Sequence, residues 1–198
     1  MRPVLPRLLA LVIALIAAPA WPAEEMAPVE AVALLRGGGY ILYFRHVATD
    51  FSQNDAKMTS FEDCATQRNL TDKGRADARA IGAAIRELGI PIGKVRASPF
   101  CRTIETADLA FGRAEPAAAG RGGPPQPENP DRYAALRRLL ASPPARGTND
   151  VIVSHGNPFH AVAGPPYLAE GEAAVVQPTG TGFRVITRIK GDEWAIAH

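Results

Sequence analysis

The feature that most limits how this chain can fold is its alternation of apolar runs with helical patterns. Residues 40–44 read Tyr-Ile-Leu-Tyr-Phe, and residues 151–153 read Val-Ile-Val. Such wholly apolar runs are typical of strands buried on both faces, as in parallel sheets that helices cover. The sequence therefore predicts an α/β fold, a three-layer α/β/α sandwich with a mostly parallel central sheet.

The boundaries of the expected elements follow from capping and turn residues. Thr71 can cap one helix, and Ser98-Pro99 and Asn157-Pro158 each supply a cap followed by a first-turn proline. Residues 112–130 are crowded with Gly, Pro and Ala, which favours an irregular loop. We expect helices at 29–36, 71–88, 98–109 and 131–140, a helix after 157, and strands at 40–44, 94–97, 150–154, 173–177 and 183–189.

The amino-terminal segment has the pattern of a secretory signal peptide. Arg2 and Arg7 precede an apolar run over 8–18, and Ala18-Pro19-Ala20 resembles a cleavage site. The run is shorter than the roughly 20 residues that cross a bilayer, so we expect no stable membrane span after cleavage. We predict a signal peptide at 1–20, with cleavage as late as 23 as an alternative, a single domain over 24–198, and a periplasmic or secreted protein.

The charge balance argues against a nucleic-acid partner. The chain has 22 basic and 20 acidic residues, and loss of Arg2 and Arg7 makes the two counts equal. A neutral chain lacks the broad positive field that non-specific nucleic-acid binding requires. Any site for an anion must therefore be local.

The two cysteines bear on redox state and on metals. In an oxidising compartment thiols tend to pair, but the spacing of Cys64 and Cys101 alone leaves open whether they form a disulfide. Two cysteines cannot build a cysteine-rich zinc site, and His160 and His198 offer no metal-ligand spacing with the other histidines. We expect no metal site.

Three predicted strand-to-helix junctions carry groups that can bind phosphate. Arg45-His46 follows the first strand, Arg102 follows Ser98-Pro99, and His155 follows residues 151–154. Ligands of open α/β sheets bind beyond the carboxyl ends of the strands, where helix amino termini favour anions. The three junctions could therefore converge on one phosphate.

The chemistry of these groups fits a phosphate monoester. Arginine forks match the oxygens of a phosphate dianion, and a neutral imidazole is a competent nucleophile toward phosphorus when its other nitrogen is held. A lone histidine or arginine is more often a core or surface group, so the prediction depends on the whole set.

The same residues form motifs that resemble a known superfamily. They are Phe44-Arg45-His46, Leu70-Thr71 with Gly74, residues 98–103 with Glu105-Thr106-Ala107, and residues 153–156, which read Val-Ser-His-Gly. Together they resemble the histidine phosphatase, or phosphoglycerate mutase-like, superfamily, and the chain looks like a small exported bacterial-type member. The resemblance covers residues 40 to about 189.

The resemblance implies a role for each matched residue. His46 would form a phosphohistidine, while Arg45, Arg102 and His155 would bind and stabilise the transferring phosphoryl group. It implies a phosphomonoester hydrolase that needs no metal or organic cofactor. Two alternatives stay open: a phosphomutase, and a non-catalytic phosphate-binding member of the same fold.

The chain departs from the family pattern after the nucleophile. Family members commonly have Gly there, whereas this chain has Val47, which resists a positive φ, so the loop must differ locally. The leaving oxygen also needs a proton donor, for which we name Glu172 as candidate, with Glu115, Glu128, Asp131 and Asp50 as competitors. The expected partner is a phosphorylated small molecule or envelope component, and the sequence leaves its identity and the oligomeric state open.

Overall fold

The computed structural model describes residues 26–122, 129 and 131–197. The predicted signal peptide lies outside the described residues. None of the helices in the described ranges is both long enough and apolar enough to cross a membrane.

The centre of the molecule is a six-stranded sheet with the order β3-β2-β4-β1-β5-β6. The first four strands in this order are parallel, and β5 and β6 form an antiparallel hairpin along the edge of β1. The strands are β1 (Ile41–Arg45), β2 (Ile92–Ala97), β3 (Glu115–Pro116), β4 (Asn149–Ser154), β5 (Ala173–Pro178) and β6 (Phe183–Ile189).

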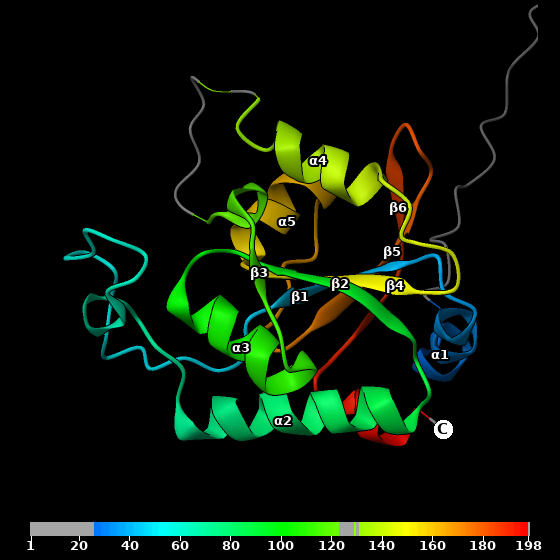
Figure 1. The fold of residues 1–198 in the computed structure, drawn as a ribbon, viewed down its shortest axis with the longest axis horizontal. Helices are drawn as coiled ribbons and strands as arrows, with labels where there is room; N and C mark the ends of the chain where they lie inside the picture. Colours follow the sequence, from blue (N-terminus) through cyan, green and yellow to red (C-terminus); the bar gives the residue numbers. More distant parts are fainter. Residues whose placement is uncertain (1–25, 123–128, 130, 198) are drawn as a thin grey trace, which may run out of the picture.

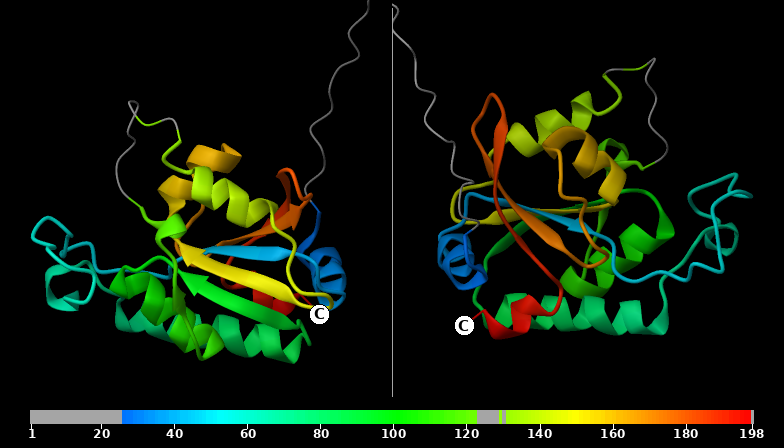
Figure 2. Two further views of the ribbon diagram at one scale, coloured as in Figure 1. Left: turned by 45° about the horizontal axis from the view of Figure 1, so that its top comes forward. Right: turned by 180° about the vertical axis from the view of Figure 1, so that it is seen from behind.

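Helices cover both faces of this sheet, as Figures 1 and 2 show. One face carries α4 (Ala134–Ala141) and α5 (Gly156–Ala163), and the other carries α2 (Asp72–Glu87) and α3 (Cys101–Phe111). The helix α1 (Pro28–Arg36) lies against β6. The predicted three-layer α/β/α sandwich with a mostly parallel sheet is confirmed.

The alternation of side chains along β1 explains why both faces need a cover. Leu42 and Phe44 pack into the cluster under α1, α2 and α3, whereas Ile41 and Tyr43 pack into the cluster under α4 and α5. Successive side chains of a strand point to opposite faces, so a wholly apolar strand is stable only between two helical layers.

Three of the predicted helix starts were placed wrongly, and one of them is that of α4, which begins at Ala134 instead of 131. Thr71 caps α2 as expected, since its Oγ1 accepts a hydrogen bond from the Gly74 N–H at 3.0 Å. By contrast, α3 begins at Cys101 and its N-cap is Phe100, because the Ser98 side chain hydrogen-bonds a histidine ring instead. Similarly, α5 begins at Gly156 with His155 as N-cap, two residues before the predicted Asn157 cap.

The Gly- and Pro-rich segment 112–130 is also more ordered than the composition indicated. It contributes the edge strand β3 and the 3-10 helix η2 (Ala118–Gly120). Backbone pairing of β3 with the end of β2 supplies the order that side-chain packing alone would not. Residues 123–128 and 130 lie outside the described part.

Candidate active site

The predicted junctions meet beyond the carboxyl ends of β1, β2 and β4. The His46 N–H donates to the Ser154 carbonyl at 3.0 Å, and the Ser98 N–H donates to the Val153 carbonyl at 2.9 Å. The three strands are thus held together one residue past their ends. His46, His155 and Arg102 are brought together there and are all buried.

His46 is held in one tautomer. Its Nδ1 lies 2.9 Å from the Val47 carbonyl oxygen, which can only accept, so Nδ1 carries the proton and Nε2 keeps its lone pair. Burial, followed by the charges of Arg102 and Arg45, lowers the pKa of His46 to about 3, although the Val47 hydrogen bond works against this shift. The imidazole is therefore neutral at physiological pH.

Val47 takes a place in the core instead of the glycine conformation of the family pattern. It is 1% exposed, and among the described residues only glycines have a positive φ. Its carbonyl supplies the hydrogen bond to His46, so a β-branched residue at this position leaves the bond to Nδ1 in place.

His155 faces His46 across the site. The centroids of the two rings are 5.5 Å apart, in an edge-on arrangement. His155 Nε2 lies 2.9 Å from Ser98 Oγ, which fixes the orientation of the ring. Burial, together with the charge of Arg102, lowers the pKa of His155 well below its ordinary value, so this imidazole is also neutral.

Arg102 is a buried cation with one donor unused. Its Nη1 and Nη2 each donate to a carboxylate oxygen of Asp55 at 3.0 Å, and Nη1 also reaches the Arg68 carbonyl at 3.3 Å. Its Nε is buried and makes no hydrogen bond with any described residue. A buried donor without an acceptor costs free energy, which a bound anion would recover.

Arg45 is anchored to the turn before β5. Its Nη1 donates to the Leu168 carbonyl at 2.9 Å, and its Nη2 pairs with Glu170 at 3.3 Å. Its guanidinium also stacks on the Tyr167 ring at 5.4 Å. These contacts orient Arg45 next to the nucleophile.

The carboxylate closest to His46 belongs to Glu170, which the sequence did not single out. Glu170 Oε1 lies 3.9 Å from His46 Nδ1 and accepts a hydrogen bond from Thr49 Oγ1 at 2.7 Å. Glu172, our candidate proton donor, instead accepts from the Ala169 N–H at 2.6 Å within its own turn. Its role as general acid stays a prediction.

Arg68 is a second residue that the motifs missed. Its guanidinium lies 4.6 Å from the centroid of Phe51 and makes no hydrogen bond with any described residue. Its charge lowers the pKa of both His46 and His155, which places it close to the site. The usable signal was its position two residues before Leu70-Thr71, in the segment that returns to the site after β1.

Asp55 holds this segment onto the site. Its carboxylate bridges the Arg102 guanidinium and the Arg68 N–H, the latter at 2.9 Å. Burial raises the pKa of Asp55, but the hydrogen bonds from Arg68 and Arg102 outweigh it and keep the pKa below its ordinary value. The aspartate is therefore ionised, and it leaves the Arg68 side chain free to meet an anion.

Comparison with known proteins agrees with this geometry. The family model for the histidine phosphatase superfamily (branch 1) matches residues 41–121, which include His46 and Arg102. No curated protein sequence matches the chain.

Several solved structures share the fold at low sequence identity. The protein histidine phosphatase SixA complexed with tungstate is 16% identical with a TM-score of 0.51, over 77% of this chain and 97% of that chain. The putative phosphohistidine phosphatase SixA from Agrobacterium tumefaciens is 14% identical with a TM-score of 0.52, over 76% and 97%. A phosphoserine phosphatase from Entamoeba histolytica, in complex with 3-phosphoglyceric acid, is 13% identical with a TM-score of 0.52, over 75% and 95%.

These likenesses concern the fold, while the family model covers the segment that carries the first histidine and the buried arginine. The segment 41–121 therefore matches the histidine phosphatase superfamily, and the chain as a whole shares the fold of these phosphatases.

Proposed function

We propose that this protein hydrolyses phosphate monoesters through a phosphohistidine on His46. The observation that carries the proposal is the pair of neutral, buried imidazoles 5.5 Å apart beside a buried arginine with an unused donor. An unprotonated nitrogen provides the nucleophile, and the arginine provides charge for the phosphoryl oxygens.

The reaction consists of two in-line transfers. In the first, the lone pair of His46 Nε2 forms a bond to phosphorus while the bond from phosphorus to the ester oxygen breaks, and the leaving oxygen takes up a proton. In the second, water attacks the phosphorus and returns a proton to the group that protonated the leaving oxygen. The phosphorus–nitrogen bond breaks, and inorganic phosphate leaves with the neutral imidazole restored. Arg45, Arg102 and His155 stabilise the equatorial oxygens in both steps.

The local charges suit a dianionic substrate. A phosphate monoester carries nearly two negative charges at neutral pH, since its second pKa is about 6. Asp55 and Glu170 each pair with one arginine, which leaves the charge of Arg68 to meet the incoming anion. No step of this scheme requires a metal ion or organic cofactor.

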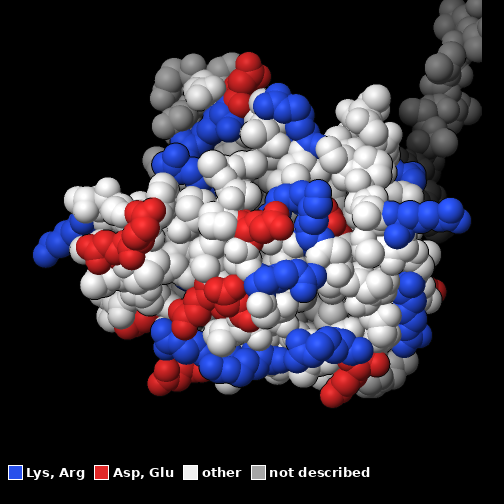
Figure 3. Space-filling view, viewed as in Figure 1, with Lys and Arg blue, Asp and Glu red and all other residues white. Residues whose placement is uncertain are grey.

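We also propose that the protein is exported and that its substrate is a phosphorylated small molecule or envelope component. The amino-terminal pattern and the cysteine pair support a periplasmic or secreted location. Figure 3 shows basic and acidic side chains interleaved over the face viewed, which supports the absence of a nucleic-acid partner.

The test is hydrolysis of p-nitrophenyl phosphate by the purified protein with and without a chelator. We expect turnover that the chelator leaves unchanged, and a loss of at least about 1000-fold in His46→Ala, because no other group takes over the covalent step. The control is His160→Ala, an exposed histidine on α5, which should keep full activity.

Rapid quench in alkaline detergent with a radiolabelled monoester should trap a phosphoenzyme in the wild type, stable to base and labile to acid, and none in His46→Ala. Undiminished hydrolysis in His46→Ala, or turnover that the chelator abolishes, would overturn the mechanism. Phosphate binding without any phosphoenzyme would favour the non-catalytic alternative. Return of the label to a different oxygen of the same substrate molecule, with little release of inorganic phosphate, would favour the mutase.

A further inference from the structure

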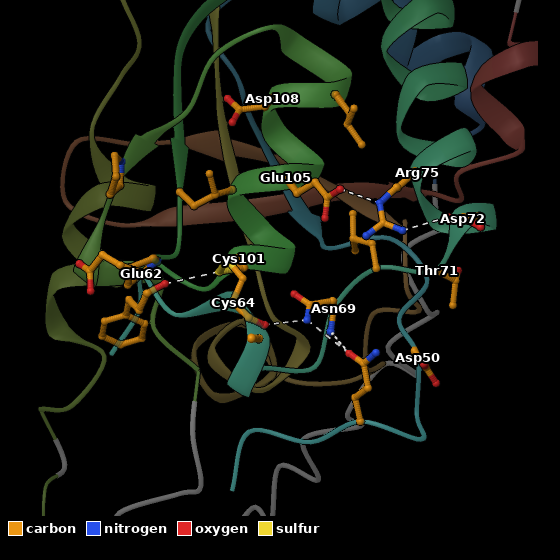
Figure 4. Close-up of a pocket in the computed structure, with 18 residues that line it drawn as sticks. Asp50, Glu62, Cys64, Asn69, Thr71, Asp72, Arg75, Cys101, Glu105 and Asp108 are labelled. Atoms are coloured by element: carbon orange, nitrogen blue, oxygen red, sulfur yellow. Dashed lines mark hydrogen bonds and ion pairs between the residues drawn. A yellow bond between two sulfur atoms is a disulfide. The ribbon is translucent and has the colours of Figure 1, made fainter. Parts of the chain in front are cut away.

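A large groove lies outside the site around the two histidines. Its volume is about 1120 Å³, and its walls come from the segment 50–72 and from the outer face of α3. Figure 4 shows Glu105 and Asp108 on α3, with Arg75 and Asp72 reaching the groove from α2. Nothing in the proposed reaction uses this groove.

The groove combines an apolar lining with carboxylates. The apolar lining consists of Phe61, Leu70, Pro99, Ile104, Leu109 and Pro116. The acidic residues that line it are Asp50, Glu62, Asp72, Glu105 and Asp108. Arg75 is the only basic residue in this lining, and it is already engaged by Glu105 at 2.6 Å and by Asp72 at 3.0 Å.

Asp108 is the carboxylate that most clearly lacks a partner. Its side chain makes no hydrogen bond or ion pair with any described residue, while the neighbouring wall partly desolvates it and raises its pKa. Glu105 lies three residues earlier, on the same face of the helix. A cation placed in the groove would compensate both the desolvation of Asp108 and the excess of negative charge.

We propose that this groove binds a polypeptide segment that combines basic and apolar side chains. The carboxylates are spread along the walls, and the described part of the chain contains no cluster of three or more metal-ligating side chains, so a single metal ion does not fit. The volume of the groove is at or above that of typical small-molecule sites. An extended polypeptide can place its charged amino or guanidinium groups on the carboxylates and its apolar side chains on the apolar lining.

The position of the groove relates it to the phosphate site. Phe61 lines the groove and packs against Phe100 at 5.1 Å, and Phe100 in turn packs edge-on against His155 at 4.9 Å. The phosphate site, with its buried Arg102, therefore adjoins a groove that is lined mainly by carboxylates and apolar side chains. Of the substrates proposed above, this favours an envelope component that is a phosphorylated polypeptide, and the interpretation of the bound segment as its flank rests on the proposed function.

The experiment measures binding by fluorescence anisotropy, independently of catalysis. The probe is a short fluorescein-labelled peptide that alternates Lys and Leu, and the comparison peptide alternates Glu and Leu. We expect the wild type to bind only the first. Binding should weaken as NaCl is raised from about 0.1 M to about 1 M, since the Debye length falls from about 10 Å to about 3 Å.

Charge reversal locates the binding site. Asp108→Lys should weaken binding of the Lys-Leu peptide by at least about tenfold, because a like charge then faces the cationic side chains. The matched control is Glu87→Lys, an exposed charge reversal at the far end of α2, which should leave binding unchanged. Both variants should retain hydrolysis of p-nitrophenyl phosphate, which reports on the other site.

Three results would overturn the proposal: no binding of the basic peptide by the wild type, equal binding of both peptides, or equal loss in the two variants. Light scattering provides a further check, since self-association that Asp108→Lys abolishes would assign the groove to a second copy of this chain. If the protein binds the peptide but does not hydrolyse p-nitrophenyl phosphate, the proposed function is wrong, while the proposal that the groove binds a polypeptide segment is supported.

Discussion

Glu170 connects two of the candidate catalytic groups. It pairs with Arg45 at 3.3 Å, accepts from Thr49 Oγ1 at 2.7 Å and from the Thr49 N–H at 3.3 Å, and lies 3.9 Å from His46 Nδ1. When phosphorus bonds to Nε2, the imidazole becomes positively charged, and a carboxylate beside Nδ1 would stabilise that charge. Its separation from Nδ1 exceeds hydrogen-bond length, so we assign it a positioning role.

Glu170→Gln should therefore lower kcat by about 10- to 100-fold and have a small effect on stability. The amide can still accept from Thr49, but it loses the charge that holds Arg45 and balances the imidazolium. The measurement is steady-state hydrolysis of p-nitrophenyl phosphate, with urea unfolding as the check on folding. A kcat equal to that of the wild type would contradict the positioning role.

The variant Glu172→Gln tests whether Glu172 donates the proton to the leaving oxygen or only shapes its own turn. Its amide oxygen can keep the hydrogen bond from the Ala169 N–H, so the turn should survive. A general acid matters most for a poor leaving group, so its loss should slow an alkyl phosphate by about 100-fold or more and p-nitrophenyl phosphate little. Equal small effects on both substrates would remove Glu172 as the proton donor.

The segment from Asp50 to Asn69 is the element on which the site depends most and which has the least regular structure. It supplies Asp55 and Arg68 to the site, yet it contains only the 3-10 helix η1 (Cys64–Thr66). The Gln67 side chain accepts from the Cys101 N–H at 3.0 Å and donates to the Phe61 carbonyl at 3.0 Å. A Cys64–Cys101 disulfide joins the segment to the first residue of α3.

Removal of this disulfide should loosen the segment. The bond spans 37 residues, and a loop of this length corresponds to roughly 2–4 kcal/mol of stability. Cys64→Ser combined with Cys101→Ser should lower the free energy of unfolding by that amount and lower kcat/KM, because Asp55 no longer holds Arg102 firmly. Urea unfolding and p-nitrophenyl phosphate hydrolysis measure the two effects.

Dithiothreitol provides the control for this experiment. It should reproduce both losses in the wild type and have no effect on the double variant. Unchanged stability and activity in the double variant would show that the hydrogen bonds of Gln67 suffice to order the segment.

The contrast between strands and loops also explains how much the sequence could predict. The ends of the five predicted strands were placed within two residues, because apolar runs and capping residues are local signals, and the junction residues His46 and His155 follow from those ends. Glu170 and Arg68 lie in segments without periodicity, and their approach to His46 depends on long-range hydrogen bonds. The Ser98 cap failed for the same reason, since the side chain has a tertiary partner.

The folded protein buries two imidazoles, and the sheet has an apolar cluster on each of its faces. One cluster surrounds Phe44 under α2 and α3, and the other surrounds Tyr43 under α4 and α5. His46 is 1% exposed and His155 is 6% exposed. Burial disfavours the protonated form of both, so the folded protein binds fewer protons at these positions than the unfolded chain does.

As the pH is lowered, the free energy of unfolding should therefore begin to fall at a higher pH than the titration of carboxylates alone would cause. Below about pH 6.5 the unfolded chain protonates both imidazoles while the folded protein keeps them neutral, so stability is complete above that pH and declines as the pH falls toward the lowered pKa values. Each histidine contributes a slope of up to about 1.4 kcal/mol per pH unit.

Urea unfolding between pH 7.5 and about pH 5 measures the combined slope, and His46→Asn should lower it by about 1.4 kcal/mol per pH unit. His160→Asn, which changes an exposed imidazole, is the matched control variant. A wild-type slope near zero over this range would mean that the buried imidazoles take up protons without unfolding, which contradicts the neutral nucleophile on which the mechanism depends.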